Sequence, residues 1–261
     1  MKKYLAIFQT QLAHSLAYPL DLLGRSFMTV PFMWIFAQLW TVVYTANGSG
    51  SLNGLTLAAT LWYLMLAETI ELSRPRLANT IAEQVKDGSI AYLLNKPMNF
   101  LLYHYSSAIA ESVFRAVMVA FFGSAVVWWM MGAPPSLWGF AAVLPAILGA
   151  WTVNFCLSAL IGLAAFVTED VSAFTWIYQK LAFIFGGLLI PLDFYPAWLR
   201  ALANALPFQS MIYAPARLFV EPSLVRLASV LGSQLLWSAT LILLLLWAYK
   251  QGERWLTVNG G

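Results

Sequence analysis

Long apolar stretches separated by short polar segments dominate the chain. Their apolar residues lack the period-two alternation of a membrane strand. A helix needs roughly 20 apolar residues to cross a bilayer, and only helices or closed barrels satisfy their backbone groups in lipid. The pattern therefore predicts an all-α integral membrane protein with six transmembrane helices. We place them near Phe27–Tyr44, Leu55–Ile70, Ser106–Met131, Trp138–Val167, Ala173–Ile190 and Ala228–Tyr249.

Residues 1–20 follow a different pattern, in which apolar residues recur at helical spacing. From Leu5 to Leu16 these residues would form one face of a helix. Such a helix can lie in the plane of the membrane interface, and Pro19 would end it. Polar side chains inside this stretch interrupt the apolar core that a signal peptide requires. An ordinary cytoplasmic tail is the alternative.

The segment 72–104 is a basic, amphipathic insert between the second and third predicted spans. It carries Arg74, Arg76, Lys86 and Lys96. A helix that protrudes from a membrane protein can lie in the groove of a soluble partner. This segment is therefore the candidate docking site for such a partner.

Prolines recur within residues 191–227, between the fifth and sixth predicted spans. Proline permits short helices and sharp turns but no continuous span, and the aromatic side chains here are typical of a membrane interface. We expect two short re-entrant helices near Ala197–Ala205 and Ser210–Val220. A folded outer loop without a role in transport is the alternative. The candidate outer gate comprises Pro191, Pro196, Trp198, Pro207 and Phe208.

Composition agrees with a membrane protein. Hydrophobic residues make up 61% of the chain and charged residues 10%, whereas soluble domains carry about 25% charged residues. The net charge of +3 comes mostly from residues that flank the spans, so we expect no nucleic-acid partner. No repeat or second domain is visible, and residues 1–261 are expected to form one transmembrane domain.

The basic residues of the connections predict the orientation, because lysine and arginine accumulate on the cytoplasmic side. The richer side places both termini in the cytoplasm. It collects Lys2, Lys3, Arg74, Arg76, Lys86, Lys96, Lys250 and Arg254, and the other side collects Arg200, Arg217 and Arg226.

Five ionisable residues lie inside predicted spans: Glu68, Glu71, Glu111, Arg115 and Lys180. Such groups are costly in lipid unless they are paired or hydrated, so they should face protein or water. One interpretation is a cytoplasmic vestibule with three carboxylates and two cations, which would favour cationic amphipaths. The other is a structural salt-bridge network that joins spans two, three and five. Both stay open.

The chain lacks a phosphate-binding loop of the type Gly-x-x-x-x-Gly-Lys-Ser/Thr, so we expect no ATP hydrolysis by this polypeptide. His14, His104 and Cys156 lie far apart in the sequence. A metal site or a Cys-His nucleophile pair is therefore not expected. A membrane enzyme built on this chain would depend on its carboxylates.

Two stretches resemble the type-2 ABC transporter permeases, the six-helix membrane subunits common in bacterial exporters. The first runs from Asp87 to Pro97 and is similar to the family's Gly-x-x-x-x-x-Leu-x-x-Pro pattern after the second span. The second runs from Gly186 to Leu199, with Leu206-Pro207-Phe208 after it, and is similar to the outer end of span five and the re-entrant helices. With the six-span layout, the resemblance covers the whole chain.

The resemblance implies a permease that pairs with a second copy, identical or homologous, above two ATP-binding subunits. ATP and Mg would bind those subunits, and this chain would hold no cofactor. A coupling helix at about Ala78–Asp87, ended by Gly88, would contact the ATP-binding subunit. The expected contacts are Arg74, Arg76, Glu83, Lys86, Asp87 and Gly88. An interfacial helix that binds anionic lipid is the alternative.

The resemblance also implies a function: a multi-pass permease of the bacterial inner membrane that exports an amphipathic or hydrophobic cargo, drug-like or lipid-like. Two alternatives come from other classes. One is an intramembrane lipid-modifying enzyme with Glu68 and Glu71 as acid and base. The other is a membrane scaffold subunit without transport.

Overall fold

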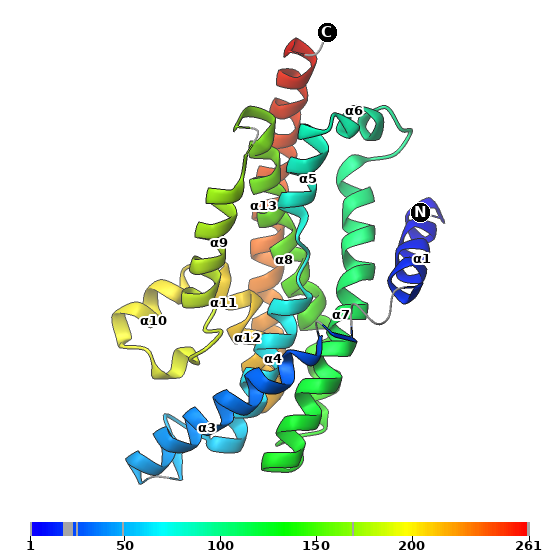
Figure 1. The fold of residues 1–261 in the computed structure, drawn as a ribbon. Coiled ribbons are helices and arrows are strands. Elements are labelled where there is room, and N and C mark those ends of the chain that lie inside the picture. Colours follow the sequence, from blue (N-terminus) through cyan, green and yellow to red (C-terminus); the bar gives the residue numbers. More distant parts are fainter. Residues whose placement is uncertain (1, 18–22, 25, 49, 169, 260–261) are drawn as a thin grey trace.

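The computed structural model describes residues 2–17, 23–24, 26–48, 50–168 and 170–259, with side chains as far as Gly252. Nearly all of the described elements are helices (Figure 1), which confirms the all-α prediction for this part of the chain. Pro19 and the side chain of Arg254 lie outside the described residues.

Four of the described helices are long and apolar enough to cross a membrane. They are α3 (Thr29–Asn47), α7 (Phe100–Met131), α8 (Trp138–Thr168) and α13 (Leu224–Asn259). In α13 the long apolar stretch is Leu224–Gly252. The predicted second and fifth spans are occupied by shorter helices: α4 (Leu57–Ser73) has 17 residues and α9 (Ser172–Phe185) has 14. Length and apolarity thus support four of the six predicted spans.

Two long helices extend into segments predicted as connections. α7 begins at Phe100, earlier than predicted, because the Asn99 side chain accepts a hydrogen bond of 2.9 Å from the Leu102 amide and caps the helix. α13 begins at Leu224, where the Ser223 hydroxyl accepts from a backbone amide of the first turn. The end of the basic insert and the end of the proline-rich segment are therefore helical.

The two short helices have identifiable start and stop signals. β1 (Ser51–Leu52) and β2 (Leu55–Thr56) form a small antiparallel hairpin that the apolar pattern did not reveal. The Thr56 hydroxyl then accepts from the Ala59 amide at 3.2 Å and starts α4 at Leu57. The hairpin and this cap together delay the start of the second predicted span.

α9 stops at Phe185 instead of continuing to Ile190. Gly187 has φ +69°, and a Cβ there would lie 3.0 Å from the Tyr63 hydroxyl. That hydroxyl donates to the Gly187 carbonyl at 2.6 Å. The close contact with α4 therefore requires glycine and turns the chain.

Shorter elements complete the fold: α1 (Lys2–Ala17), α5 (Leu77–Lys86), α6 (Ser89–Leu94), the 3-10 turn η1 (Leu192–Phe194), α10 (Ala197–Asn204), α11 (Phe208–Met211) and α12 (Tyr213–Val220). α1 lies beside α7. The Lys3 Nζ donates to the Pro97 carbonyl at 2.9 Å, and the Tyr4 hydroxyl accepts from the Asn99 amide at 3.1 Å. These two bonds attach the N-terminal helix to the end of the basic insert.

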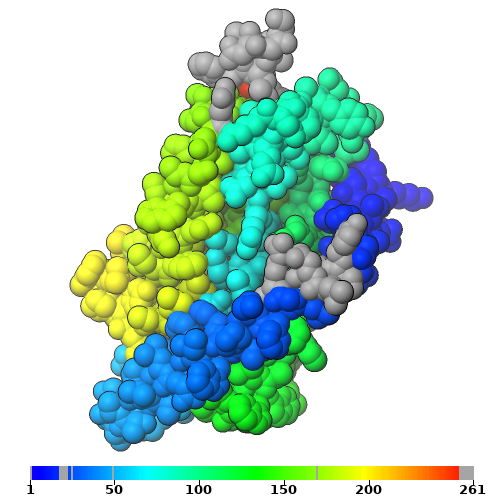
Figure 2. Space-filling model, viewed as in Figure 1, coloured from blue at the N-terminus to red at the C-terminus, as the bar shows by residue number. Residues whose placement is uncertain are grey.

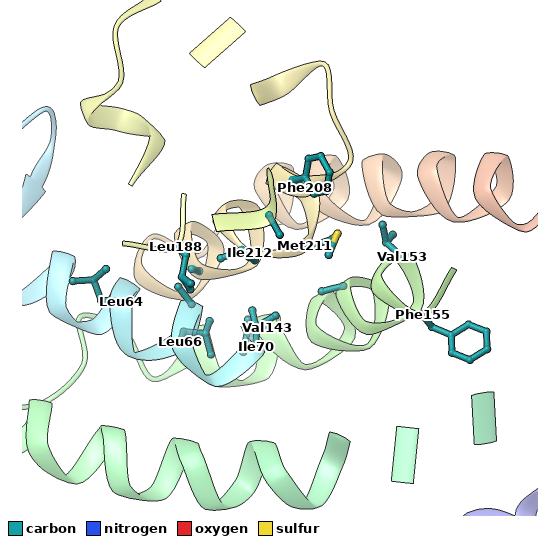
Figure 3. Close-up of a cluster of buried hydrophobic side chains, with 14 of the residues drawn as sticks. Leu64, Leu66, Ile70, Val143, Val153, Phe155, Leu188, Phe208, Met211 and Ile212 are labelled. Carbon is teal, nitrogen blue, oxygen red and sulfur yellow. The ribbon is translucent and has the colours of Figure 1, made fainter. Parts of the chain in front are cut away.

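α4 is the centre of the fold, with 14 of its 17 residues buried. Figure 3 shows Leu64, Leu66 and Ile70 of α4 in the same core as side chains from α8, α11 and the turn after α9. In Figure 1, α5, α6 and the C-terminal part of α13 gather at one end of the molecule, and the outer part of α3 and α10 lie toward the other. α4 joins these two ends through the interior.

Candidate functional site: a cavity beside helix α4

A cavity of about 670 Å³ lies between α3, α9 and the junction of α4 with α5. We name it the Glu68 cavity. In Figure 2 the cyan residues of this junction lie recessed between α9 and α3. Its walls combine apolar and polar side chains. The apolar ones include Phe32, Phe36, Leu72, Phe183, Leu188 and Leu189, and the polar ones include Glu68, Glu71, Arg74, Arg76, Ser158, Tyr178 and Gln179.

One ion pair is built into the wall. The Arg74 guanidinium lies 2.9 Å from a carboxylate oxygen of Glu71 and 5.3 Å from the centre of the Tyr178 ring. The Tyr178 hydroxyl in turn accepts from the Asn154 amide at 2.8 Å. Only 12% of the Arg74 side chain and 8% of the Glu71 side chain are exposed. The charges of Glu71 and Arg74 therefore neutralise each other in a fixed position.

Glu68 is different. It lies about one helical turn before Glu71 on the same face of α4 and is only 6% exposed. It also lines the cavity. No other described residue forms an ion pair or hydrogen bond with its carboxylate. Glu68 is thus a buried acidic group that has no counter-charge among the described residues.

The structure does not join the five intramembrane charges predicted to act together. Glu111 and Arg115 form an ion pair on α7, away from the cavity wall. Lys180 is exposed on α9, with its ammonium 5.5 Å from the Trp176 ring centre. It follows Tyr178 by two residues, or about 200° around a helix, and so faces away from the cavity. The described contacts therefore do not join these residues in the predicted network of spans two, three and five, and of the five residues Glu68 and Glu71 line the cavity.

α5 occupies the predicted position of the coupling helix. Its inner face packs on α8, where a Cβ added to Gly162 would lie 2.9 Å from Ile81 Cδ1 and 3.3 Å from Ala78 Cα. The Ser158 hydroxyl also accepts from the Ala78 amide at 3.1 Å. This close contact fixes α5 to α8. The outer face carries the exposed side chains of Glu83 and Lys86, and the flanking residues Arg76 and Asp87 are also exposed.

The turn after α5 has the predicted left-handed residue. Gly88 has φ +74°, and a Cβ added there would have no neighbouring atom within 4 Å. The Asp87 carboxylate accepts from the Ser89 amide at 2.9 Å. Hydrogen bonds from the hydroxyl and amide of Ser89 lower the pKa of Asp87. The turn is therefore set by both the backbone and a side chain.

Arg74 departs from the predicted set of docking contacts. We expected it on the surface of the coupling segment, but it points into the cavity wall against Glu71 and Tyr178. The reason is the extended backbone of Arg74 (ψ 148°) before Pro75, which separates α4 from α5. Arg74 consequently belongs with α4 rather than with α5.

The candidate outer gate separates into two groups. Pro207 and Phe208 are buried, and the Phe208 ring centre lies 6.1 Å from that of Tyr178. Pro191 is also buried, whereas Pro196 is exposed and Trp198 is 70% exposed. Phe208 thus lies directly behind the Glu68 cavity, and Trp198 lies on the surface of α10.

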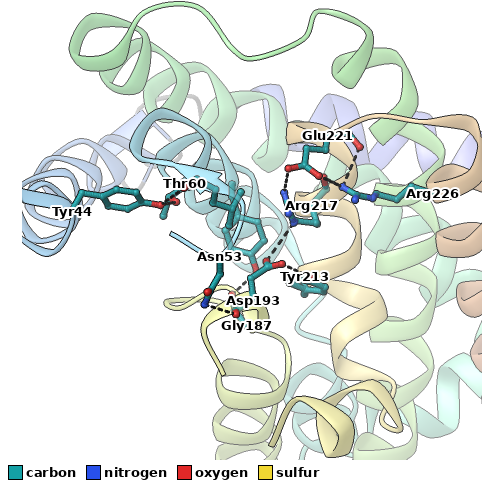
Figure 4. Close-up of polar contacts among 11 residues, drawn as sticks. Tyr44, Asn53, Thr60, Gly187, Asp193, Tyr213, Arg217, Glu221 and Arg226 are labelled. Atoms are coloured by element: carbon teal, nitrogen blue, oxygen red, sulfur yellow. Dashed lines mark hydrogen bonds and ion pairs between the residues drawn. The ribbon is translucent and has the colours of Figure 1, made fainter. Parts of the chain in front are cut away.

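The proline-rich segment 191–227 also contains a polar cluster that the sequence pattern did not predict. We name Asp193, Arg217, Glu221 and Arg226, with Tyr213, the Asp193 network (Figure 4). The Arg217 side chain lies 3.3 Å from the Asp193 carboxylate and 2.6 Å from that of Glu221. Arg226 lies 3.0 Å from Glu221, and the Tyr213 hydroxyl donates to Asp193 at 3.2 Å. The signal available in the sequence was a lone aspartate within the proline-rich segment.

A comparison with protein families agrees with this architecture. The model of the ABC-2 family transporter protein matches residues 29–260. The match includes the helices around the cavity, α5 and the Asp193 network. The chain therefore belongs to the ABC-2 family of transporter proteins, and its resemblance to the type-2 ABC transporter permeases is confirmed. No curated protein matches the chain.

Family membership, together with the four long apolar helices, identifies a multi-pass membrane protein of a transport system. Membrane subunits of this family generally work with ATP-binding subunits. The family match concerns the chain as a whole and assigns no role to α5 or to the residues of the Glu68 cavity.

Proposed function

We propose that the chain is the permease subunit of an ATP-driven exporter in a bacterial inner membrane. It would move an amphipathic or hydrophobic cargo, drug-like or lipid-like, out of the cytoplasm or the inner leaflet. Two permease copies, identical or homologous, would pair above two ATP-binding subunits. Those subunits would bind ATP and Mg, and this chain would bind neither.

In this proposal α4 and α9 complete a set of six spans. Burial of α4 among its neighbours supports this, because an inner helix does not need to match the lipid thickness alone. The basic residues around α5 and α6 support a cytoplasmic position for that end of the molecule, and both termini would lie on the same side. The hairpin, η1 and α10 would then lie on the outer side.

The proposal rests on the two different faces of α5, one exposed and polar and the other packed on α8. Its outer face bears the exposed polar residues Glu83 and Lys86. Its inner face is fixed to α8 at Gly162. α8 in turn contributes Ser158 to the wall of the Glu68 cavity. A movement of an ATP-binding subunit against α5 would therefore be transmitted to the cavity.

The test replaces Gly88 with valine. A β-branched side chain at φ +74° strains the turn by about 1–2 kcal/mol, which would displace α5 relative to its partner. We expect a complex that assembles but loses cargo-stimulated ATPase activity and export after reconstitution. Lys86→Glu should reduce stimulation much less, because an exposed ion pair contributes about 0–1 kcal/mol.

Gly48→Val is the matched control. Gly48 has φ +62° and equally open surroundings, but it lies after α3 at the opposite end of the molecule. It imposes similar strain without touching α5. Equal stimulation and export in the parent and Gly88→Val complexes would show that α5 is not the coupling element.

A further inference from the structure

We propose that the cargo is a lipophilic organic monocation that binds in the Glu68 cavity, with the Glu68 carboxylate as its counter-ion. The inference rests on the proposed transport function, because it takes this cavity to be part of the cargo path. It names the charge and chemical class of the ligand and the residue that selects it.

Among the described residues around the cavity, one carboxylate has no counter-ion. Glu71 and Arg74 form a pair at 2.9 Å, and Arg74 is held in addition over the Tyr178 ring. Arg76 also lines the cavity, but it is exposed, so water screens its charge. Glu68 is 6% exposed and has no partner among the described residues. A cation that enters the cavity would pair with Glu68 without displacing a bond to any described residue.

The remaining walls fit an apolar and aromatic body. Phe32 and Phe36 of α3 stack with ring centres 4.4 Å apart, and both line the cavity. Phe183 of α9 also lines it. Aromatic faces attract cations, and apolar walls bury the hydrocarbon around a delocalised charge. The site therefore suits a cation whose charge is surrounded by apolar groups, rather than a small hydrated ion.

The size of the cavity agrees with an organic ligand. Its volume of about 670 Å³ lies within the range of about 300–1,000 Å³ that is typical of small-molecule sites. One carboxylate without a partner among the described residues offsets one positive charge, and the paired Glu71 and Arg74 add no net charge to offset a second. The cavity should therefore prefer a monocation to a dication of similar size.

The test uses two ions of matched shape and opposite charge, tetraphenylphosphonium and tetraphenylborate. Binding would be measured to the co-purified complex in lipid nanodiscs without ATP, after subtraction of binding to empty nanodiscs. We expect saturable phosphonium binding and at least tenfold weaker borate binding. Glu68→Gln should weaken phosphonium binding at least tenfold, and Glu68→Asp should retain most of it.

Glu111→Gln is the matched control, because it removes a carboxylate on α7 outside the cavity wall. It should bind phosphonium like the parent. The proposal is overturned if Glu68→Gln binds phosphonium like the parent, or if both ions bind equally well. Loss of binding in both Glu68→Gln and Glu68→Asp, with the complex still monodisperse, would also overturn a role for the charge.

The outcome is separable from that of the transport test. If phosphonium binding depends on Glu68 but ATPase activity is not coupled to export, the binding-site proposal holds and the proposed exporter function is refuted. If export is coupled to ATP hydrolysis but the complex does not bind phosphonium, the exporter function holds and the binding-site proposal is refuted.

Discussion

The Glu68 cavity and the Asp193 network both contain charged side chains that pack against the same apolar bundle. They differ in whether each of these side chains has a partner of opposite charge. In the Asp193 network each charged side chain has a partner of opposite charge within 3.3 Å. In the cavity, Glu71 has such a partner, whereas Glu68 lines the cavity and has no such partner in the part of the chain that the structure describes. The difference indicates that the first cluster holds elements together and that the second is open to a ligand.

The two regions also differ in what they join. The Asp193 network connects η1 to α12 and the start of α13, and Asn53 of the hairpin loop donates to the Asp193 carbonyl at 2.9 Å. It therefore ties four segments together, and Asn53 and Asp193 are 140 residues apart in the sequence. The cavity lies between α3 and α9, and the charged residues of its wall belong to α4 and the link to α5. α11 contacts both α9 of the cavity wall and α12 of the network, and its Phe208 ring centre lies 6.1 Å from that of Tyr178.

The largest expected effect comes from breaking the paired region. Arg217→Met removes the counter-charge of Asp193 and Glu221, and the Arg217 and Asp193 side chains are only 11% and 15% exposed. Removing one partner of a buried pair costs about 3–5 kcal/mol. We expect a clear loss of thermal stability of the purified complex. The exposed Arg200→Met is the control. An unchanged melting temperature for Arg217→Met would refute a structural role for the network.

The opposite sign is expected for the unpaired region. Glu68→Gln removes a buried carboxylate without a counter-ion among the described residues, so it should leave the free energy of unfolding unchanged or raise it by about 1 kcal/mol. Thermal unfolding without ligand is the measurement. Destabilisation as large as that of Arg217→Met would mean that Glu68 has a structural partner, and the comparison would fail.

The smallest effect is a pH dependence in the paired region. Burial alone would raise the pKa of Glu221, but the hydrogen bonds and charges of Arg217 and Arg226 outweigh it and lower the pKa below the usual 4.5. The stability that Glu221 contributes is thus fully present above pH 4.5 and is lost as the pH falls through the lowered pKa. Because 42% of this side chain is exposed, solvent limits the effect.

We expect Glu221→Gln to flatten the decline of the melting temperature between about pH 5 and pH 3, relative to the parent. Glu68→Gln should leave that decline unchanged, because Glu68 is not part of the network. Parallel curves for the parent and Glu221→Gln would contradict the lowered pKa.

Much of the local structure was predictable from short-range patterns. The apolar stretches predicted α3, α7, α8 and α13, because the length needed to cross a membrane is a property of one segment. Gly88 predicted the left-handed turn after α5, because only glycine adopts that conformation without strain. Helix ends were less predictable. Asn99 and Thr56 cap helices at positions that hydropathy alone does not reveal.

Which charges meet was decided by the tertiary structure. The sequence singled out Glu68 and Glu71, but it grouped them with Glu111 and Lys180, which the packing places elsewhere. It did not reveal that Asp193 meets Arg217, which follows it by 24 residues and belongs to another element.

The physical reason is that helical periodicity assigns each side chain to a face but does not say which face of another helix lies opposite. That choice depends on how all helices pack around the buried α4. The sequence by itself therefore determined the class of protein, most of its helices and its candidate coupling segment. The tertiary structure decided that Arg74 neutralises Glu71, that Glu68 has no such partner among the described residues, and that a cavity opens beside it.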